Sequence, residues 1–243
     1  MLNGTRPFFT RLLTPVGEAL ARTPITPNMV TVTGTVGLSA SVLWGYPTGH
    51  LFLGTIVATF FVFTDMLDGV LARIKGTSGK FGAFLDSTMD RIADAAVFSG
   101  LAIWFVRGGH NQLLAGLSLF CLVAGALVSY VKARAEGLGT TANVGIAERP
   151  ERMVVTFVAV GLSGLGVPYI LPIGLWALAA ASVITVGQRI IAVHRGLAVK
   201  PVTDPAATPS AATPSAATPP PATDGNAAEQ TETGSAPAAH TIE

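Results

Sequence analysis

Charged side chains are scarce in this sequence. Only 12% of its 243 residues are Asp, Glu, Lys or Arg, against roughly 25% in an ordinary soluble domain. Half of the residues are hydrophobic, and they form long blocks, some of which reach the about 20 apolar residues that a bilayer-spanning helix needs. The scarcity of charge therefore argues against an ordinary soluble domain and predicts an all-α integral membrane protein.

Cysteine is almost absent as well. The one cysteine, Cys121, lies within an apolar run, so no disulfide forms within one chain, and a buried packing role explains it better than a nucleophilic one. We expect no cleavable signal peptide, because the first 27 residues contain four prolines and no clean apolar core.

Basic residues are missing from the last part of the chain. Residues 201–243 contain five acids and no Lys or Arg, and they repeat a five-residue unit of Ala, Thr, Pro and Ser. This composition cannot bury a core, so we expect a disordered Pro/Ala/Thr-rich tail without a catalytic role. Residues 1–200 hold all fifteen Lys and Arg and nine acids, a balance of +6, which suits a protein that handles phosphates beside an anionic leaflet.

Six apolar segments follow a short lead-in. Residues 8–21 have the spacing of an amphipathic helix at the membrane interface, although Pro15 and Gly17 leave an irregular lead-in open. The first span begins after Thr26-Pro27-Asn28, a typical helix start. We therefore expect a lead-in (1–27), a six-span domain (28–200) and the tail (201–243). The predicted membrane spans are residues 28–47, 51–75, 80–106, 112–135, 150–166 and 169–193.

The distribution of cations predicts the orientation. With six spans and both ends on one side, nearly all cations fall at one face, Arg91 lies inside a span, and only Arg107 falls at the other face. Positive residues stay cytoplasmic, so both termini should be cytoplasmic in the plasma membrane. The cations at the cytoplasmic face are Arg6, Arg11, Arg22, Arg73, Lys75, Lys80, Lys132, Arg134, Arg149, Arg152, Arg189, Arg195 and Lys200.

Two predicted spans carry acids that a membrane interior disfavours. Asp65 and Asp68 share one helical face in the second span, and Asp86 and Asp90 share one in the third. Ionisable groups inside a span indicate a functional site. Four facing carboxylates must take up protons or bind cations, and oxygen ligands favour Mg²⁺ or Mn²⁺. Two such ions about 4 Å apart would suit phosphoryl chemistry.

Small residues accompany the carboxylates. Gly69, Ala72 and Arg73 continue the first acidic face, and Gly82 begins the second. These small side chains would leave room for a nucleotide between the carboxylates and Arg73. Close packing of membrane helices is an equally good explanation of the small residues alone.

Together these residues read Asp65-x2-Asp68-Gly69-x2-Ala72-Arg73-x8-Gly82-x3-Asp86-x3-Asp90. The pattern resembles the signature of the CDP-alcohol phosphotransferase family at all eight fixed positions, and the resemblance extends over residues 1–200. It implies a six-span bundle with a short amphipathic lead helix. It also implies that Asp65, Asp68 and Asp86 ligate metal. Asp90 would ligate a second metal and act as general base on the acceptor hydroxyl.

The same resemblance implies contacts with the CDP-lipid. It places them on Gly69 and Arg73, at the start of the first span, and in the linker after Arg73. Close relatives often have a hydroxyl residue where Gly79 stands, so a contact there would use the backbone. The implied CDP-lipid residues are Asn28, Met29, Val30, Thr31, Gly69, Arg73, Gly79 and Gly82.

A second group of charges bears on the acceptor. Three predicted helix ends present Lys132, Arg134, Arg149, Arg152 and Arg189 at the cytoplasmic face, and arginine forks suit a phosphate monoester. Lys132, Arg152 and Arg189 lie deeper towards the spans, so we expect these three to bind an acceptor phosphate. Setting the membrane topology, or pairing with Glu148 or Glu151, explains any one of these cations equally well.

Residues 131–136 and 148–152, with Thr26-Pro27-Asn28, are similar to actinobacterial phosphatidylinositol phosphate synthases. That similarity implies CDP-diacylglycerol as donor, inositol 1-phosphate as acceptor, and a homodimer; no nucleic-acid partner is expected. One alternative is a phosphatidylglycerophosphate synthase, which uses glycerol 3-phosphate. A divalent cation transporter is a distant alternative, disfavoured because Arg73 lies on the acidic face and no internal repeat is found.

Overall fold

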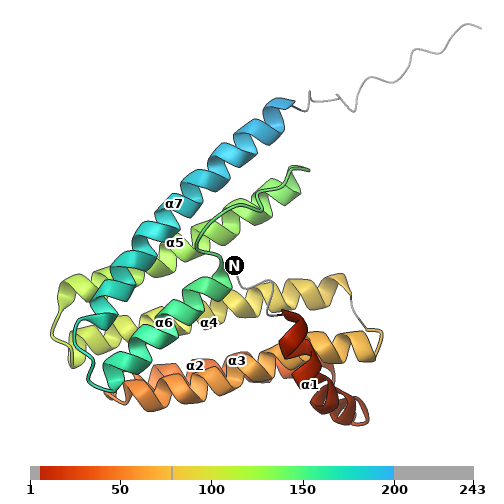
Figure 1. The fold of residues 1–243 in the computed structure, drawn as a ribbon, viewed down its shortest axis with the longest axis horizontal. Helices are drawn as coiled ribbons and strands as arrows, with labels where there is room; N and C mark the ends of the chain where they lie inside the picture. Colours follow the sequence, from red (N-terminus) through yellow and green to blue (C-terminus); the bar gives the residue numbers. More distant parts are fainter. Residues whose placement is uncertain (1–5, 78, 200–243) are drawn as a thin grey trace, which may run out of the picture. The chain divides into compact units, whose positions relative to one another are not determined.

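The described part of the chain is entirely helical. The computed structural model describes residues 6–77 and 79–199, without the side chains of residues 6–13 and 199. This part contains seven helices and no strand, which confirms the all-α prediction, while the tail at 201–243 lies outside it. The helices are α1 (Arg6–Ala21), α2 (Pro27–Gly45), α3 (Leu51–Ile74), α4 (Lys80–Arg107), α5 (Gln112–Gly137), α6 (Arg149–Gly164) and α7 (Ile170–Val199) (Figure 1).

The helix starts follow local signals. The Thr26 hydroxyl accepts a hydrogen bond from Met29 N–H at 3.3 Å, and Pro27 occupies the first turn, where its missing N–H costs no helical bond. The Asn111 side chain caps α5 in the same way, accepting from Leu114 N–H at 3.1 Å. Each of the six predicted segments coincides with a helix. The last helix, α7, continues beyond the predicted end at 193 to Val199.

The lead-in is a helix rather than an irregular segment. α1 starts two residues before the predicted helix and continues through Pro15. It packs against α3. Just after α3, Lys75 Nζ donates to the carbonyls of Thr23 and Ile25, in the segment that follows α1, at 2.9 and 2.7 Å. Because the side chains of residues 6–13 are outside the description, the interfacial face of α1 stays a prediction.

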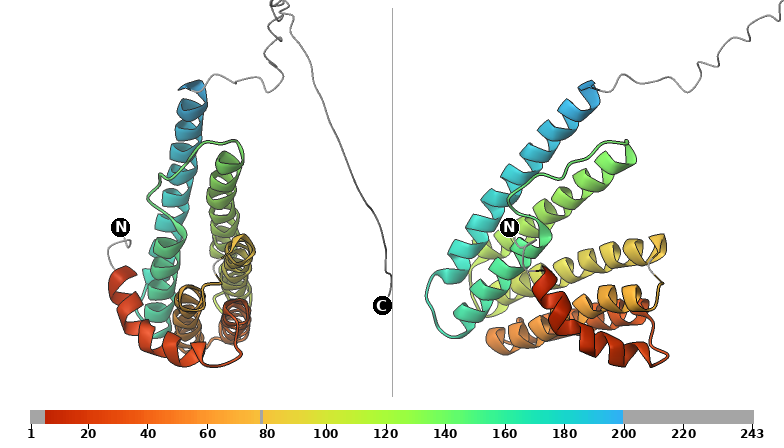
Figure 2. Two further views of the ribbon diagram at one scale, coloured as in Figure 1. Left: turned by 90° about the vertical axis from the view of Figure 1, so that its right-hand side faces the viewer. Right: turned by 45° about the vertical axis from the view of Figure 1, so that its right-hand side comes forward.

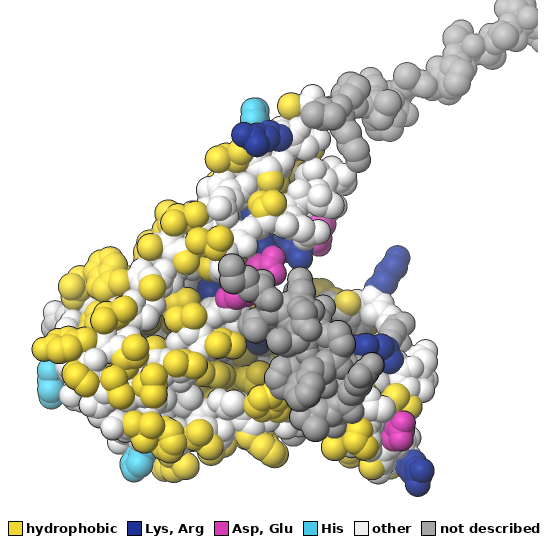
Figure 3. Space-filling view, viewed as in Figure 1, with side chains coloured by type: hydrophobic (Ala, Val, Ile, Leu, Met, Phe, Trp, Pro, Cys, Tyr) yellow, Lys and Arg dark blue, Asp and Glu magenta, His cyan; other side chains and the backbone are white. Residues whose placement is uncertain are grey.

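The surface of the bundle is that of a membrane protein. Among the described helices, α3, α5 and Ile170–Ala198 of α7 are long and apolar enough to cross a bilayer. Large apolar side chains point outward, with Phe60 66% and Leu113 67% exposed, whereas soluble monomers rarely expose such extended apolar surface. Figure 3 shows apolar side chains covering much of one face, with acidic and basic side chains gathered beside it.

The apolar core lies towards one end of the bundle. Its members come from the C-terminal halves of α2 and α4, the N-terminal halves of α3, α5 and α7, and the length of α6, among them Val42, Tyr46, Phe98, Leu101 and Leu175. Towards the other ends of these helices, α5 and α7 diverge from α2, α3 and α4 (Figures 1 and 2). The first turn of α6 lies between the two groups, and this is where the charged residues meet.

Glycines let α2 and α3 approach closely in the core. A Cβ added to Gly45 would lie 2.8 Å from the Cα of Gly54, and small residues commonly permit such contact between membrane helices. Next to this contact, the hydroxyls of Tyr46 and Thr55 lie 3.2 Å apart and are buried. The distance between these two helices is therefore set by direct contact between their backbones.

We expect Gly45→Ala to destabilise the protein by about 1–3 kcal/mol, the usual cost of over-packing, because the added methyl meets backbone that cannot rotate away. Gly116→Ala is the matched control, since a Cβ at Gly116 on α5 meets nothing within 4 Å. Thermal unfolding of the purified protein in detergent measures the difference. Equal midpoints for the two variants would contradict the close contact between α2 and α3.

Candidate metal and phosphate site

Three carboxylates converge where α3 faces α4. Asp65 and Asp68 lie one turn apart on α3, and Asp86 lies on α4. Each offers an oxygen, and these oxygens all lie within 4.8 Å of one another. The structure thus brings together three of the four aspartates that the sequence singled out.

The arrangement fits a divalent cation. Asp65 Oδ1 is buried and has no hydrogen-bond partner among the described residues. The Thr31 hydroxyl on α2 donates to Asp68 Oδ2, and such an outer contact orients a ligating carboxylate. Clustered carboxylate oxygens, one of them unpartnered, are the ligands that Mg²⁺ and Mn²⁺ prefer.

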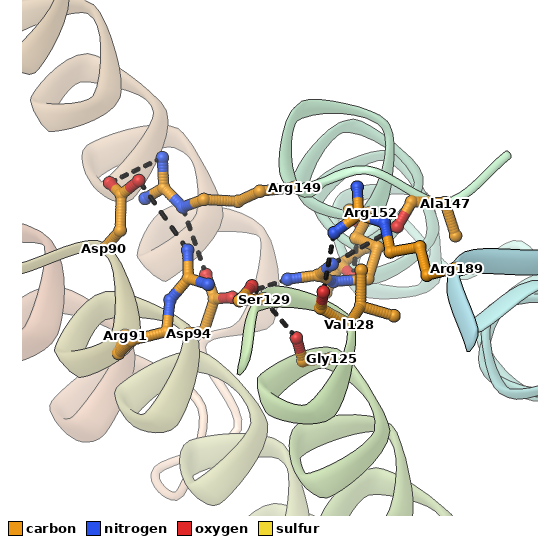
Figure 4. A network of polar contacts seen from close by, with 11 residues as sticks. Asp90, Arg91, Asp94, Gly125, Val128, Ser129, Ala147, Arg149, Arg152 and Arg189 are labelled. Carbon is orange, nitrogen blue, oxygen red and sulfur yellow. Dashed lines mark hydrogen bonds and ion pairs between the residues drawn. The ribbon is translucent and has the colours of Figure 1, made fainter. Parts of the chain in front are cut away.

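The fourth aspartate has different partners. Asp90 lies one turn beyond Asp86 on α4, and its Oδ1 forms an ion pair with Arg149 Nη1 at 2.8 Å, while Oδ2 lies 3.7 Å from Arg91 Nη2 (Figure 4). Asp90 interacts electrostatically with Asp65 and Asp86 but is not part of the three-carboxylate group. Its place at a second metal stays a prediction.

Two glycines near the carboxylates leave space beside the backbone. A Cβ added to Gly69 would meet nothing within 4 Å, and one added to Gly82 would approach only Asn28 Oδ1, at 3.7 Å. Arg73 is exposed, and its Nε donates to the Gly69 carbonyl at 3.1 Å. Gly82 therefore lies next to Asn28 at the start of α2, and the nucleotide contacts predicted for Asn28, Gly69, Arg73 and Gly82 stay predictions.

The other candidates for nucleotide contacts lie in different environments. Met29 is 55% exposed and Val30 is buried. Gly79 precedes α4 in an extended conformation. The roles predicted for these three residues stay predictions.

The arginines predicted to bind an acceptor phosphate are buried. Arg152 is 1% and Arg189 3% exposed. Arg152 donates from Nη1 to the Ala147 carbonyl at 3.3 Å and from Nη2 to Asp94 Oδ2 at 2.9 Å. Lys132 is partly exposed on α5. Arg152 keeps further N–H groups, because a guanidinium has five and these two contacts use two of them.

Arg189 helps to hold the segment that precedes α6. Its Nε and Nη1 donate to the carbonyls of Val144 and Val128 at 2.9 and 2.6 Å, and its Nη2 lies 3.4 Å from Glu148 Oε1. One turn earlier on α7, the Thr185 hydroxyl accepts from the backbone N–H groups of residues 146 and 147 at 3.2 and 3.0 Å. These contacts position the first turn of α6, and with it Arg149 and Arg152.

Asp94 and Arg149 belong to the site but are not among the site residues predicted from the sequence. Asp94 is 5% exposed and pairs with Arg149 Nε at 3.3 Å and with Arg152 Nη2 at 2.9 Å. The signal that points to Asp94 is its position one turn after Asp90, on the acidic face of α4. Arg149 was recognised only as one of five basic residues at helix ends.

Comparison with known proteins agrees with this geometry. A family model described as CDP-alcohol phosphatidyltransferase matches residues 24–193. The phosphatidylinositol phosphate synthase of Streptomyces avermitilis is 48% identical over 203 residues, which cover 80% of this chain and 83% of that protein.

Solved structures have the same fold. The crystal structure of Mycobacterium tuberculosis phosphatidylinositol phosphate synthase with CDP-DAG bound has a TM-score of 0.73 and 44% identity, covering 75% of this chain and 94% of that one. The same protein in complex with manganese and citrate has a TM-score of 0.72 and 43% identity, with coverages of 75% and 88%.

The family match includes all the aspartates and arginines of the site. Because the matched family consists of transferases, the match argues against the alternative that this chain is a cation transporter. This chain therefore belongs to the CDP-alcohol phosphatidyltransferase family and is a membrane-integral enzyme.

Proposed function

We propose that this enzyme transfers the phosphatidyl group of CDP-diacylglycerol to a hydroxyl of inositol 1-phosphate and releases CMP. The observation that carries the proposal is a continuous row of charged groups. Asp90 lies between the three-carboxylate cluster and a pair of arginines, Arg149 and Arg152, which Asp94 joins. A donor diphosphate requires the first part of this row, and a phosphorylated acceptor requires the last.

At the donor end, Asp65, Asp68 and Asp86 would hold one divalent cation and Asp90 would share a second. Two such ions, Mg²⁺ or Mn²⁺, supply neutralisation of charge on the diphosphate and on the departing CMP. The relative crystallised with manganese and the relative with CDP-DAG bound support this assignment.

The CDP group would lie along the open backbone of α3 and α4. Gly69 and Gly82 leave room for it, and Asn28 and Arg73 border the same space. Thr31 would act through its bond to Asp68. Met29, Val30 and Gly79 complete the proposed set of CDP-lipid contacts.

In the reaction, Asp90 accepts the proton of the acceptor hydroxyl. The hydroxyl oxygen forms a bond to the phosphorus that carries diacylglycerol, and the bond between this phosphorus and the CMP oxygen breaks, so CMP leaves with the electron pair. Oδ2 of Asp90, 3.7 Å from Arg91, is the less engaged oxygen and would take the proton. The side chains contribute position and electrostatic stabilisation, with no covalent intermediate.

At the acceptor end, Lys132, Arg152 and Arg189 would hold the phosphate of inositol 1-phosphate. Arginine suits this purpose because its planar fork matches phosphate oxygens. The printed names of the relatives support inositol phosphate as the acceptor. Glycerol 3-phosphate would need similar cations. The charges alone therefore indicate that the acceptor carries a phosphate, but they do not distinguish inositol from glycerol.

In the membrane, α2 to α7 would form six spans and α1 would lie at the interface. The apolar core then lies towards the outer leaflet, and the site and both termini lie on the cytoplasmic side of the plasma membrane. We further propose a homodimer, with residues 1–27 as lead-in, 28–200 as catalytic domain and 201–243 as a tail without catalytic role.

Acceptor dependence tests the proposal directly. Purified protein with CDP-diacylglycerol and Mg²⁺ or Mn²⁺ should release CMP when inositol 1-phosphate is added, and EDTA should stop the release. CMP formed only with glycerol 3-phosphate would reassign the acceptor and keep the chemistry. No release with either compound, or with free inositol or serine, would refute the proposed transfer.

Asp90→Asn should lower kcat by at least about 100-fold, because it removes a general base of nearly unchanged shape. Binding of CDP-diacylglycerol should be largely retained. Turnover measured as CMP release, beside equilibrium binding of the donor, separates the two effects. Turnover close to that of the wild type would exclude Asp90 as the base.

Thr31→Val should weaken Mn²⁺ binding by about 10–100-fold, the usual cost of losing an outer contact to a metal ligand. Valine keeps the side-chain volume but cannot donate to Asp68. Mn²⁺ titration followed by electron paramagnetic resonance, without donor, measures the affinity. Thr33→Val, at an exposed position of the same helix, is the control, and equal affinities would contradict the role of Thr31.

A further inference from the structure

Asp94 joins two arginines inside the bundle. Its Oδ1 lies 3.3 Å from Arg149 Nε and its Oδ2 lies 2.9 Å from Arg152 Nη2. Figure 4 shows Asp94 between these two side chains, with Asp90 beyond Arg149. Asp94 is 5% exposed, so it is shielded from bulk water and holds both arginines in defined directions.

Gly125 provides the space in which the Arg152 guanidinium lies. A Cβ added to Gly125 would be 3.0 Å from Arg152 Nε, 3.2 Å from Cζ and 3.3 Å from Nη2. The guanidinium therefore lies directly against the backbone of α5, in a place where an added methyl group would make an unusually tight contact. An alanine here would displace the Arg152 head group.

Arg152 is thus fixed from three directions. Asp94 on α4 holds Nη2, the Ala147 carbonyl before α6 holds Nη1, and Gly125 on α5 lies close to Nε and Cζ. Each terminal nitrogen retains a second N–H. A guanidinium held in this way is pre-organised to donate its remaining N–H groups to an anion, because little side-chain entropy is left to lose.

The same carboxylate connects Arg152 to Asp90. Arg149 contacts Asp94 through Nε and Asp90 through Nη1, the latter at 2.8 Å. Asp90 and Asp94 lie one turn apart on one face of α4. Displacing Asp94 would therefore shift two arginines. One is Arg152, at the proposed acceptor phosphate, and the other is Arg149, which pairs with the proposed base Asp90.

We propose that Asp94 and Gly125 are positioning residues for the acceptor: Asp94 orients Arg152 and Arg149 relative to Asp90, and Gly125 leaves the space that Arg152 needs. This inference rests on the proposed role of Arg152 in binding the acceptor phosphate. A purely structural role for the pair would lower stability without distinguishing acceptor from donor, whereas a positioning role changes the acceptor selectively.

Gly125→Ala is the sharper test. It should raise the KM for inositol 1-phosphate by about 3–10-fold, because the added Cβ shifts the Arg152 guanidinium by a few tenths of an ångström, less than the displacement of about 1 Å that can cost 100-fold. The KM for CDP-diacylglycerol should stay unchanged. Gly116→Ala, on the same helix but with nothing within 4 Å of the added Cβ, should match the wild type in both constants.

Asp94→Asn keeps the shape of the side chain and removes its charge. It should raise the acceptor KM, and it should also lower kcat because Arg149 loses one of its two carboxylates. Since both substitutions act through Arg152, the double variant Asp94→Asn/Gly125→Ala should raise the acceptor KM by less than the product of the single effects. If Asp94→Asn does not fold, Gly125→Ala still decides the proposal.

All variants are assayed in the full-length protein by CMP release, with each substrate varied in turn and thermal unfolding measured in parallel. A wild type that does not respond to inositol 1-phosphate would refute the proposed acceptor rather than the positioning role. With an active wild type, a Gly125→Ala variant that equals Gly116→Ala, or that changes both KM values equally, would overturn the positioning role. A selective rise in acceptor KM would establish it.

Discussion

Ionised carboxylates inside an apolar helix bundle must be neutralised, and the arrangement of the site follows from this requirement. Asp90 and Asp94 are neutralised within the protein, by Arg149 and Arg152 at the first turn of α6. The cluster of Asp65, Asp68 and Asp86 forms no ion pair among the described residues, and the buried Asp65 Oδ1 has no hydrogen bond there. The acidic faces of α3 and α4 are therefore divided between a part that arginines complete and a part that suits added cations.

The apolar core makes this charged end possible. Buried residues tie the helices together near one set of turns, so the ends of α5 and α7 can diverge from α2, α3 and α4 without loss of the fold (Figure 2). α6 is short, with 16 residues, and its first turn enters between the two groups. Contacts from Thr185 and Arg189 hold the preceding segment. Rigid elements therefore place the arginines, as pre-organised binding of a small anion requires.

Much of the fold could be predicted from local patterns. The cap at Thr26-Pro27 and the apolar blocks located the helices to within a few residues, apart from the longer C-terminal end of α7. The side of α3 and α4 on which the aspartates lie followed from helical periodicity. Of the four aspartates, the structure gathers three, while Asp90 pairs with Arg149, which is distant in sequence.

The sequence by itself determined the chemical type of this protein: a chain poor in charge, built of helices, with eight motif residues at spacings that place oxygen ligands on two helical faces. Periodicity within one helix is a local property, so spacing is enough to establish it. Tertiary structure alone decided which arginine meets which carboxylate, and that a glycine on α5 makes room for Arg152. The contacts of Asp94 with Arg149 and Arg152 join residues 55 and 58 positions apart. They depend on how α4, α5 and α6 pack rather than on any local pattern.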